Sequence, residues 1–222
     1  MRVEWYGQSA FGLCAEQGSV FIDPFGDMSP AAARGMVFDY PPIAGVAAEL
    51  VLVTHEHLDH NGVDAIGGEP TILRSTAGRL DSPIGEIVAV ASEHDQVAGT
   101  QRGPNTIFSF ELDGLRVCHF GDFGQLTLRD EQAAAIGAVD LLFLPVGGGP
   151  TIGPTQARAI VERLRPRWVV PMHYRTPRIS FLEPADAFFD MFEEVARLPS
   201  AEFDTADLST AGATIAVVPA AP

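Results

Sequence analysis

The chain has 222 residues, of which 46% are hydrophobic and 19% charged. This length suffices for a substantial core, and we expect residues 1–222 to form one domain. The 14 basic and 29 acidic residues give a net charge of −15, which repels phosphate backbones, so nucleic acid is not an expected partner. No apolar run reaches the length of a membrane span, and charge interrupts the first residues, so we expect no membrane association and a cytoplasmic location.

The N-terminal quarter shows short apolar or alternating runs separated by glycine, which predict strands at residues 3–6, 10–14 and 20–23. Residues 24–42 are rich in glycine, proline and alanine and predict a long loop beside a site. Leu50–Val53 predicts a buried strand, and further strands are expected at 71–73, 87–91, 106–112, 115–120, 139–144, 168–171 and 214–218. Helices are expected at Asp130–Ile136, Pro154–Leu164 and 184–198.

Strands come before helices in both halves of the chain. This order indicates a mixed α/β fold in which two sheets pack face to face with helices outside. Cys14 and Cys118 are expected to be reduced and buried, because a chain without a secretory signal rarely holds a disulfide.

Potential metal ligands are concentrated directly after the strand Leu50–Val53, where the chain places His55, His57, Asp59 and His60. At strand period His55 and His57 point to the same side, and the turn signal that follows leaves the other two free to face a second position nearby. Imidazoles and a carboxylate at this density suit zinc, iron or manganese. The alternative is a surface turn that happens to be rich in histidine. Since three of the chain's six histidines fall here, a metal site is the better interpretation.

Residues 54–60 resemble the His-x-His-x-Asp-His signature of the metallo-β-lactamase superfamily. Segments at 21–24, 92–95, 121–122 and 171–174 resemble the other motifs of that superfamily in the same order. Residues 102–106 and 144–148 are similar to those of a narrower branch, the L-ascorbate-6-phosphate lactonase-like hydrolases. The resemblance covers most of the chain and implies a four-layer αββα sandwich, with two mixed sheets face to face and helices outside.

The resemblance also implies a centre with two divalent metal ions, zinc first, with manganese or iron as alternatives. Its ligands would be His55, His57 and His94 for the first ion, Asp59, His60 and His173 for the second, and Asp122 as the bridge. Two such ions can share a hydroxide at neutral pH, which would attack an ester, lactone or phosphoester of a small molecule. Asp59 is the expected catalytic residue that orients this hydroxide. The expected function is therefore that of a dinuclear metal-dependent hydrolase.

Other residues are candidates for supporting roles around these ligands. Asp23 is expected to accept a hydrogen bond from a ligand imidazole and so fix its tautomer. His119 is expected nearby, and packing within the sheet is an equal alternative for it. The sequence departs from the branch at Gln8, where histidine is common, and at Pro150, where an aromatic residue often follows the glycines. A glutamine neither titrates near neutral pH nor binds metal as well as histidine does.

The substrate contacts are predicted at three positions. Arg102 and Asn105 are candidates to receive an anionic substrate group, since a guanidinium suits phosphate or carboxylate, and tying down a loop is the alternative. Tyr174 is a candidate because it directly follows His173. Residues 147–149 are three glycines that permit either close approach to a ligand or an ordinary flexible turn.

The same set of ligands is compatible with two other functions. A di-iron oxidoreductase could use similar ligands on the same scaffold, although such relatives usually carry additional electron-transfer domains. A non-catalytic metal-binding protein would keep the ligands without turnover. Assembly into a homo-oligomer is compatible with the sequence but has no motif of its own.

Overall fold

A computed structural model describes residues 1–210 and 212–222. One of its two sheets has six strands in the order β13-β1-β2-β3-β4-β5. These strands are β1 (Arg2–Gly7), β2 (Ala10–Ala15), β3 (Gly18–Ile22), β4 (Leu50–Val53), β5 (Thr71–Arg74) and β13 (Glu202–Asp204). The pairs β1–β2 and β2–β3 are antiparallel, whereas β4 joins β3 in parallel.

The second sheet has eight strands in the order β12-β14-β11-β10-β9-β8-β7-β6. They are β6 (Gly78–Ser82), β7 (Gly85–Glu93), β8 (Pro104–Leu112), β9 (Leu115–His119), β10 (Leu141–Pro145), β11 (Trp168–Met172), β12 (Val195–Arg197) and β14 (Ile215–Val218). β7, β8 and β9 alternate in direction, and β9, β10 and β11 run parallel. Both sheets are therefore mixed.

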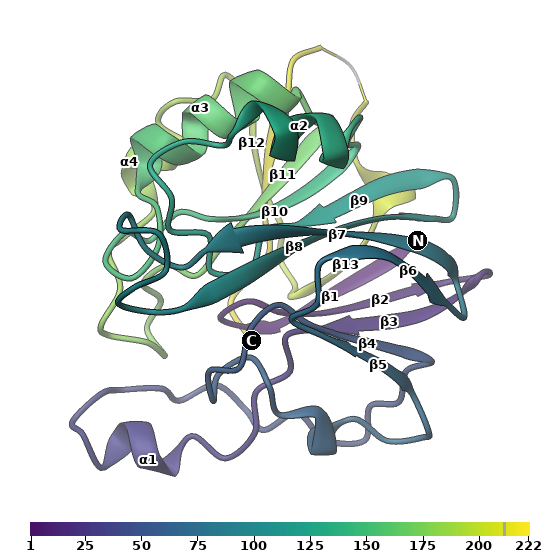
Figure 1. The fold of residues 1–222 in the computed structure, drawn as a ribbon. Helices are drawn as coiled ribbons and strands as arrows, with labels where there is room; N and C mark the ends of the chain where they lie inside the picture. Colours follow the sequence, from purple (N-terminus) through teal and green to yellow (C-terminus); the bar gives the residue numbers. More distant parts are fainter. Residues whose placement is uncertain (211) are drawn as a thin grey trace.

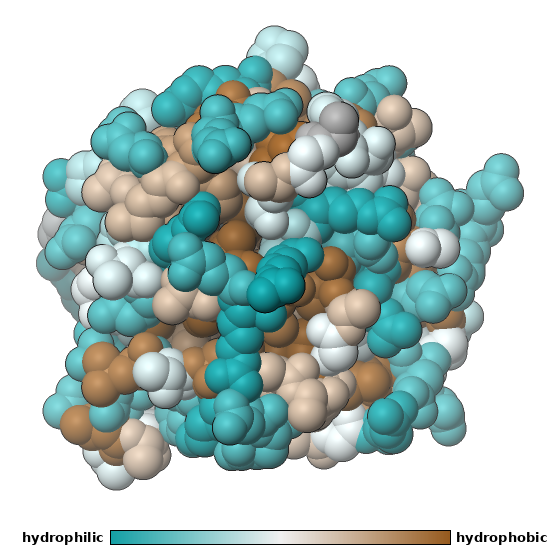
Figure 2. Space-filling view, turned by 90° about the horizontal axis from the view of Figure 1, so that it is seen from above, coloured by the Kyte–Doolittle hydropathy of each residue, from teal (hydrophilic) through white to brown (hydrophobic). Residues whose placement is uncertain are grey.

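The two sheets lie face to face, and helices lie outside them (Figure 1). α2 (Asp130–Ile136), α3 (Pro154–Leu164) and α4 (Asp186–Phe189) cover the outer face of the eight-stranded sheet. On the other side, the one-turn α1 (Ser29–Ala32) and the 3₁₀ helix η1 (Val63–Ala65) are the regular elements of the covering loops. From above, hydrophilic residues predominate around the rim and hydrophobic ones show in the hollows between them (Figure 2). The expected α/β sandwich is confirmed, with a thin outer layer on one side.

The alternation of side chains along the strands explains this layering. Ile22, Leu50 and Leu52 belong to the core cluster that also contains the inner residues of the second sheet. Their neighbours Val51 and Val53 point to the opposite face and pack in a second cluster with residues of the covering loop. Both faces of β4 are thus buried, which accounts for its uninterrupted apolar sequence.

The structure corrects several expectations about local structure. Residues 184–198 do not form one amphipathic helix: only Asp186–Phe189 is helical, and Val195–Arg197 is a strand parallel to β14. Pairing with the exposed edge of the sheet overrides the helical pattern of this segment, because backbone hydrogen bonds to β14 are available there. The strands β6 and β13 were not expected, and both lie at sheet edges and carry polar residues.

Both cysteines are free, as expected, but only Cys118 is buried, because Cys14 lies on the exposed side of β2. Among the described residues, no helix combines the length and the apolar character that crossing a membrane requires.

Candidate metal centre

The predicted ligands converge because their strands end at the same edge of the two sheets. β3 and β4 are parallel, so Asp23 and His55 follow them at one edge. β7 and β9 are both antiparallel to β8 and hence run in one direction, and β11 lies parallel to β9 through β10. His94, Asp122 and His173 follow these three strands. β4 itself ends at Val53, so His55 and His57 lie on the loop after the strand and not on the strand.

Asp122 lies at the centre of the converging side chains. Its Oδ2 is 3.1 Å from Nε2 of His94, 3.1 Å from Nε2 of His173 and 3.9 Å from Nε2 of His55. Its Oδ1 is 3.3 Å from Nε2 of His60. Four imidazole nitrogens from three different segments therefore face one buried carboxylate.

The potential ligand atoms form three groups, each compact enough to surround one ion; the third, His55, His60 and Asp122, overlaps the first two, which share no residue. The first comprises His55, His57 and His94, and the second comprises Asp59, His60 and His173. Within each group the ligand atoms lie within 4.8 Å of one another. Asp122 contacts members of both groups, so the geometry offers two adjacent positions joined by one carboxylate.

Each of four imidazoles is held through its Nδ1 atom, which leaves Nε2 directed inwards. His55 Nδ1 is 3.0 Å from Thr54 Oγ1, and His94 Nδ1 is 3.1 Å from the carbonyl oxygen of Pro150. His60 Nδ1 is 2.8 Å from Asp23 Oδ2, and His173 Nδ1 is 3.4 Å from Thr151 Oγ1. Such partners fix the tautomer and the ring orientation that a metal ligand requires.

The surroundings of His60 Nε2 fit a metal ion. This fully buried nitrogen has no hydrogen-bond partner among the described residues, although Asp122 Oδ1 lies 3.3 Å and Asp59 Oδ2 lies 3.6 Å away. Burial lowers the pKa of His60, but Asp122, Asp59 and Asp23 outweigh this effect and raise the pKa well above its usual value. The surroundings therefore favour a positive charge at this position, and a divalent cation with nitrogen and carboxylate ligands would supply it.

The charge states of the other groups also suit a cation. Burial alone would raise the pKa of Asp122, but His173, His60 and His94 hold it well below its usual value, so the carboxylate is ionised. Burial lowers the pKa of His55 to about 2, and His60 adds to the decrease, so this ring is neutral. Ionised carboxylates and neutral imidazoles are the forms that bind metal.

The backbone around Asp122 is positioned by Asn105 and Gly121. Asn105 Oδ1 accepts a hydrogen bond from the Asp122 N–H at 3.0 Å, and its Nδ2 donates to the carbonyl oxygen of Phe120 at 2.9 Å. Gly121 has φ +55°, and a Cβ there would overlap Asn105 Oδ1 and the Thr54 side chain. Only glycine therefore allows this approach, and Asn105 is a positioning residue whose amide is fully engaged by the protein.

Gln8 contacts the centre in the structure. Its Nε2 donates to Asp59 Oδ2 at 3.0 Å, and its carbonyl oxygen accepts from the His173 N–H at 3.3 Å. Gln8, Asp23 and His173 have positive φ values of 52°, 50° and 52°. Conformations that non-glycine residues rarely adopt thus cluster at this site, which is typical of functional sites.

The comparison with known proteins agrees with this geometry. A model of the β-lactamase superfamily domain matches residues 2–173, well over half of the chain. The chain belongs to the metallo-β-lactamase superfamily. It is 32% identical over 207 residues to a UPF0173 metal-dependent hydrolase of Thermococcus kodakarensis, with 79% of this chain and 85% of that relative covered.

Solved structures of other proteins share the fold. A protein of Thermotoga maritima, assigned by inference to the Zn-dependent hydrolases of the metallo-β-lactamase superfamily, aligns with TM-score 0.78 and 27% identity over 99% of both chains. A diiron β-hydroxylase of Streptomyces venezuelae shares the fold at TM-score 0.54 and 17% identity, over 78% of this chain and 44% of its own. None of these three relatives is named a lactonase, so the lactonase-like branch stays a prediction.

In this metallo-β-lactamase superfamily protein, the centre opens into a cavity of about 400 Å³. His57, Asp59, His94, Asp122 and His173 line it together with Arg102. The predicted substrate residue Arg102 is thus at the cavity.

The other two predicted substrate residues lie elsewhere. Asn105 is buried beneath Asp122, as described above. Tyr174 stacks on Trp5 with a ring-centroid distance of 5.8 Å and is not among the cavity residues. Burial raises the pKa of the Tyr174 hydroxyl well above its usual value, so this side chain is neutral and serves packing.

His119 and Gly147 have structural roles beside the centre. His119 Nε2 donates to the carbonyl oxygen of Ser9 at 3.0 Å, and its Nδ1 accepts from the Gly121 N–H at 3.1 Å. This ring therefore supports the backbone beside Asp122. Gly147 donates to the carbonyl oxygen of His173, and a Cβ at Gly147 would overlap that oxygen, so close approach here serves the His173 segment.

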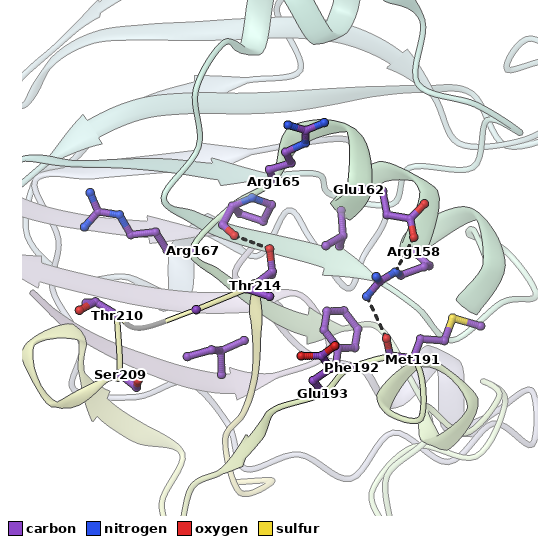
Figure 3. Close-up of a pocket in the computed structure, with 15 residues that line it drawn as sticks. Arg158, Glu162, Arg165, Arg167, Met191, Phe192, Glu193, Ser209, Thr210 and Thr214 are labelled. Atoms are coloured by element: carbon purple, nitrogen blue, oxygen red, sulfur yellow. Dashed lines mark hydrogen bonds and ion pairs between the residues drawn. The ribbon is translucent and has the colours of Figure 1, made fainter.

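A larger cavity of about 660 Å³ lies between α3, Phe192 and the start of β14, and it shares no lining residue with the metal centre (Figure 3). Arg158 in its wall donates to Glu162 at 2.9 Å and to the carbonyl oxygen of Met191 at 2.9 Å. Its cationic groups are thus partly neutralised, and none of the predicted ligands faces it.

Proposed function

We propose that this protein is a dinuclear metal-dependent hydrolase that cleaves an ester, lactone or phosphoester of a small molecule. The observation that carries the proposal is the convergence of four imidazole Nε2 atoms on Asp122 between two compact ligand groups. A structural metal site would be closed by its ligands, whereas this one opens into a cavity of about 400 Å³. An open metal position beside a cavity is the arrangement of catalytic sites.

The ligand sets follow from the two groups. His55, His57 and His94 would hold the first ion, Asp59, His60 and His173 the second, and Asp122 would contact both. The nitrogen-rich first set favours zinc, and the carboxylate-containing second set also accommodates manganese or iron. When bound, two such ions lower the pKa of a water molecule to about 7 and polarise a substrate oxygen.

Side chains of the protein itself have the other proposed roles in hydrolysis. Asp59 is the proposed catalytic residue: burial raises its pKa, but His60 and His173 together outweigh this and lower the pKa, and the ionised carboxylate accepts a proton or hydrogen bond from the attacking water. Gln8 holds Asp59 Oδ2 through a hydrogen bond, which fixes the direction of the carboxylate. Arg102 at the cavity wall is the proposed contact for an anionic part of the substrate.

The test uses a panel of chromogenic phosphodiesters, carboxylic esters and lactones with metal-loaded protein. We expect turnover of at least one class, and a loss of about 100-fold or more in kcat for Asp59→Asn. Asp64→Asn is the matched control, since Asp64 is an exposed aspartate nearby that does not line the cavity. A panel in which no substrate distinguishes the Asp59→Asn variant from the wild type would favour a non-catalytic metal protein. Two equivalents of redox-active iron after native purification would favour oxygen chemistry.

A further inference from the structure

The mouth of the metal centre has a second chemical feature besides its ligands. Its cavity is bounded on one side by residues of the loop 24–42, among them Met28, Pro30 and Met36. Leu58 and Phe181 complete this wall, and both leave apolar surface open, with 54% and 38% of their area exposed. The cavity therefore has an apolar wall directly beside the candidate metal ligands.

This wall is attached to the rest of the protein. The Asp39 N–H donates to the carbonyl oxygen of Arg178 at 2.8 Å, and Phe38 forms a β-bridge with Ile179. Tyr40 Oη lies 3.0 Å from Thr176 Oγ1. The loop 24–42 and the segment 176–181 are thus joined, and together they form one side of the mouth.

Two guanidinium groups line the same cavity without protein partners. All 14 basic residues of the chain are arginines, and most of them are paired with carboxylates, carbonyl oxygens or aromatic rings. Arg34 and Arg102 line the cavity, and their guanidinium groups have no hydrogen bond or ion pair with any residue that the structure describes. Arg2 and Arg165 also lack such a partner among the described residues, so two of these four unpaired arginines line this one cavity.

One carboxylate in the same cavity wall is already engaged by another arginine. Glu56 lies in the cavity wall but receives hydrogen bonds from Arg74 at 2.6 and 3.1 Å. The backbone that carries Arg102 is also fixed, because its N–H donates to Asp95 Oδ2 at 2.8 Å. The Arg102 backbone is therefore held in place while its charged end stays available.

We propose that the substrates of this site carry an anionic group, a carboxylate or a phosphate, which Arg34 and Arg102 bind while the apolar part of the molecule lies against Leu58 and Phe181. The inference rests on the proposed hydrolase function and names the substrate class of the same site. Guanidinium groups bind carboxylates and phosphates through paired hydrogen bonds, and the open apolar surface favours a substrate that also has an apolar part. In the hydrolysis of such an ester the acyl–oxygen bond breaks, the oxygen of water bonds to the acyl carbon, the alcohol leaves with one proton, and the acid product releases the other.

The first experiment compares two activated esters with metal-loaded protein: mono-4-nitrophenyl glutarate, which is anionic, and 4-nitrophenyl pentanoate, which has the same chain length without the charge. For Arg34→Gln and Arg102→Gln we expect the ratio of kcat/KM for the anionic ester over the neutral ester to fall about 10-fold each, the value of one charge-assisted hydrogen bond. Arg165→Gln is the matched control, because Arg165 is an exposed arginine in the other cavity (Figure 3). An unchanged ratio in both cavity variants would overturn the proposal while leaving hydrolysis intact.

A binding measurement keeps the proposal testable if neither ester is turned over, an outcome that would count against the hydrolase function alone. Benzoate and phenylphosphonate are titrated calorimetrically into the metal-loaded wild type and the three variants. The metal ions contribute equally to anion binding in all four proteins, so differences in Kd between them reflect the arginine side chains. We expect Arg34→Gln and Arg102→Gln to raise the Kd of at least one anion about 10-fold, and the more sensitive anion identifies carboxylate or phosphate as the natural group. Equal Kd values for both anions in all four proteins would overturn the inference.

Discussion

The imidazole of His60 donates from Nδ1 to Asp23 Oδ2 at 2.8 Å, and both side chains are completely buried. Asp23 also accepts hydrogen bonds from the Thr54 N–H at 2.8 Å and the Thr54 hydroxyl at 2.7 Å. One carboxylate thus connects the end of β3 to the ligand loop after β4 and directs Nε2 of His60 towards Asp122. Within the second group of candidate ligands, the orientation of His60 therefore depends on Asp23.

Asp23→Asn should therefore weaken metal binding although it leaves every candidate ligand residue unchanged. We expect the affinity for the more weakly bound ion to fall about 10- to 100-fold, as is usual when the hydrogen-bond partner of a ligand imidazole is changed. Competition with a chromogenic chelator measures it. Asp39→Asn removes an exposed aspartate and should leave the affinity unchanged. Equal affinities for Asp23→Asn and the wild type would show that His60 is oriented by other means.

Gln8→Leu separates a positioning role from a structural one. Gln8 Oε1 is buried without a hydrogen-bond partner among the described residues, so replacing the amide removes an unsatisfied oxygen together with the hydrogen bond to Asp59. The free energy of unfolding of the metal-free protein should change by less than about 1 kcal/mol, because the two effects oppose each other. The affinity for the second ion should fall about 10-fold, since Asp59 loses its orientation. Gln17→Leu, at an exposed glutamine bonded to Ile84, is the control for metal affinity. A variant that unfolds readily but binds both ions normally would refute the positioning role.

Gly121→Ala tests how tightly the backbone before Asp122 is packed. Gly121 and Gly114 both have positive φ, but a Cβ at Gly114 meets nothing within 4 Å, whereas at Gly121 it overlaps Asn105 and Thr54. Gly114→Ala should cost roughly 1 kcal/mol in unfolding free energy from backbone strain alone. We expect Gly121→Ala to cost at least about 2 kcal/mol more, measured by urea denaturation, since buried neighbours must move. Equal losses of unfolding free energy in the two variants would mean that the neighbours of Gly121 move aside at little energetic cost.

Asp95 gives a pH-dependent prediction for the loop that carries Arg102. It accepts backbone hydrogen bonds from Val97, Gly99, Gln101 and Arg102. Burial raises the pKa of Asp95, but these four bonds outweigh it and lower the pKa to about 2. A carboxyl group whose pKa is lower in the folded state stabilises the fold. Its contribution is complete above the pKa of the unfolded chain, about 3.9, and is lost as the pH falls towards the pKa of the folded state. The stability difference between the wild type and Asp95→Asn should therefore shrink as the pH falls from about 5 to 2. A stability difference between the two proteins that does not change with pH would contradict this prediction.

Much of the site could be predicted because its residues directly follow apolar strands. A run such as Leu50–Val53 predicts a strand, and polar residues at its end are available for function, so His55, His94 and Asp122 are predicted as ligands together with their motifs. Parallel strands then bring these ends to one edge. The substrate side was harder to predict, since Arg34 lies on a loop without a period and reaches the cavity through contacts far away in sequence.

The differences between the expected and the observed positions have local physical causes. Tyr174 follows His173 but stacks on Trp5, because the backbone turns at His173 and directs the next side chain into the core. Asn105 faces inwards, as its amide matches the backbone of Asp122 and Phe120. The expected helix at 184–198 is replaced after Phe189, where the free edge of β14 accepts Val195–Arg197 as a strand. In each case a tertiary contact, which no sequence period encodes, decides the outcome.

The measurement that tests the central claim most directly is anomalous X-ray diffraction at the zinc absorption edge from crystals of the zinc-loaded protein. Two peaks are predicted, one in contact with His55, His57 and His94, the other with Asp59, His60 and His173, and both with Asp122. A single peak, or a pair in which either His173 or Asp122 contacts no ion, would contradict the dinuclear centre.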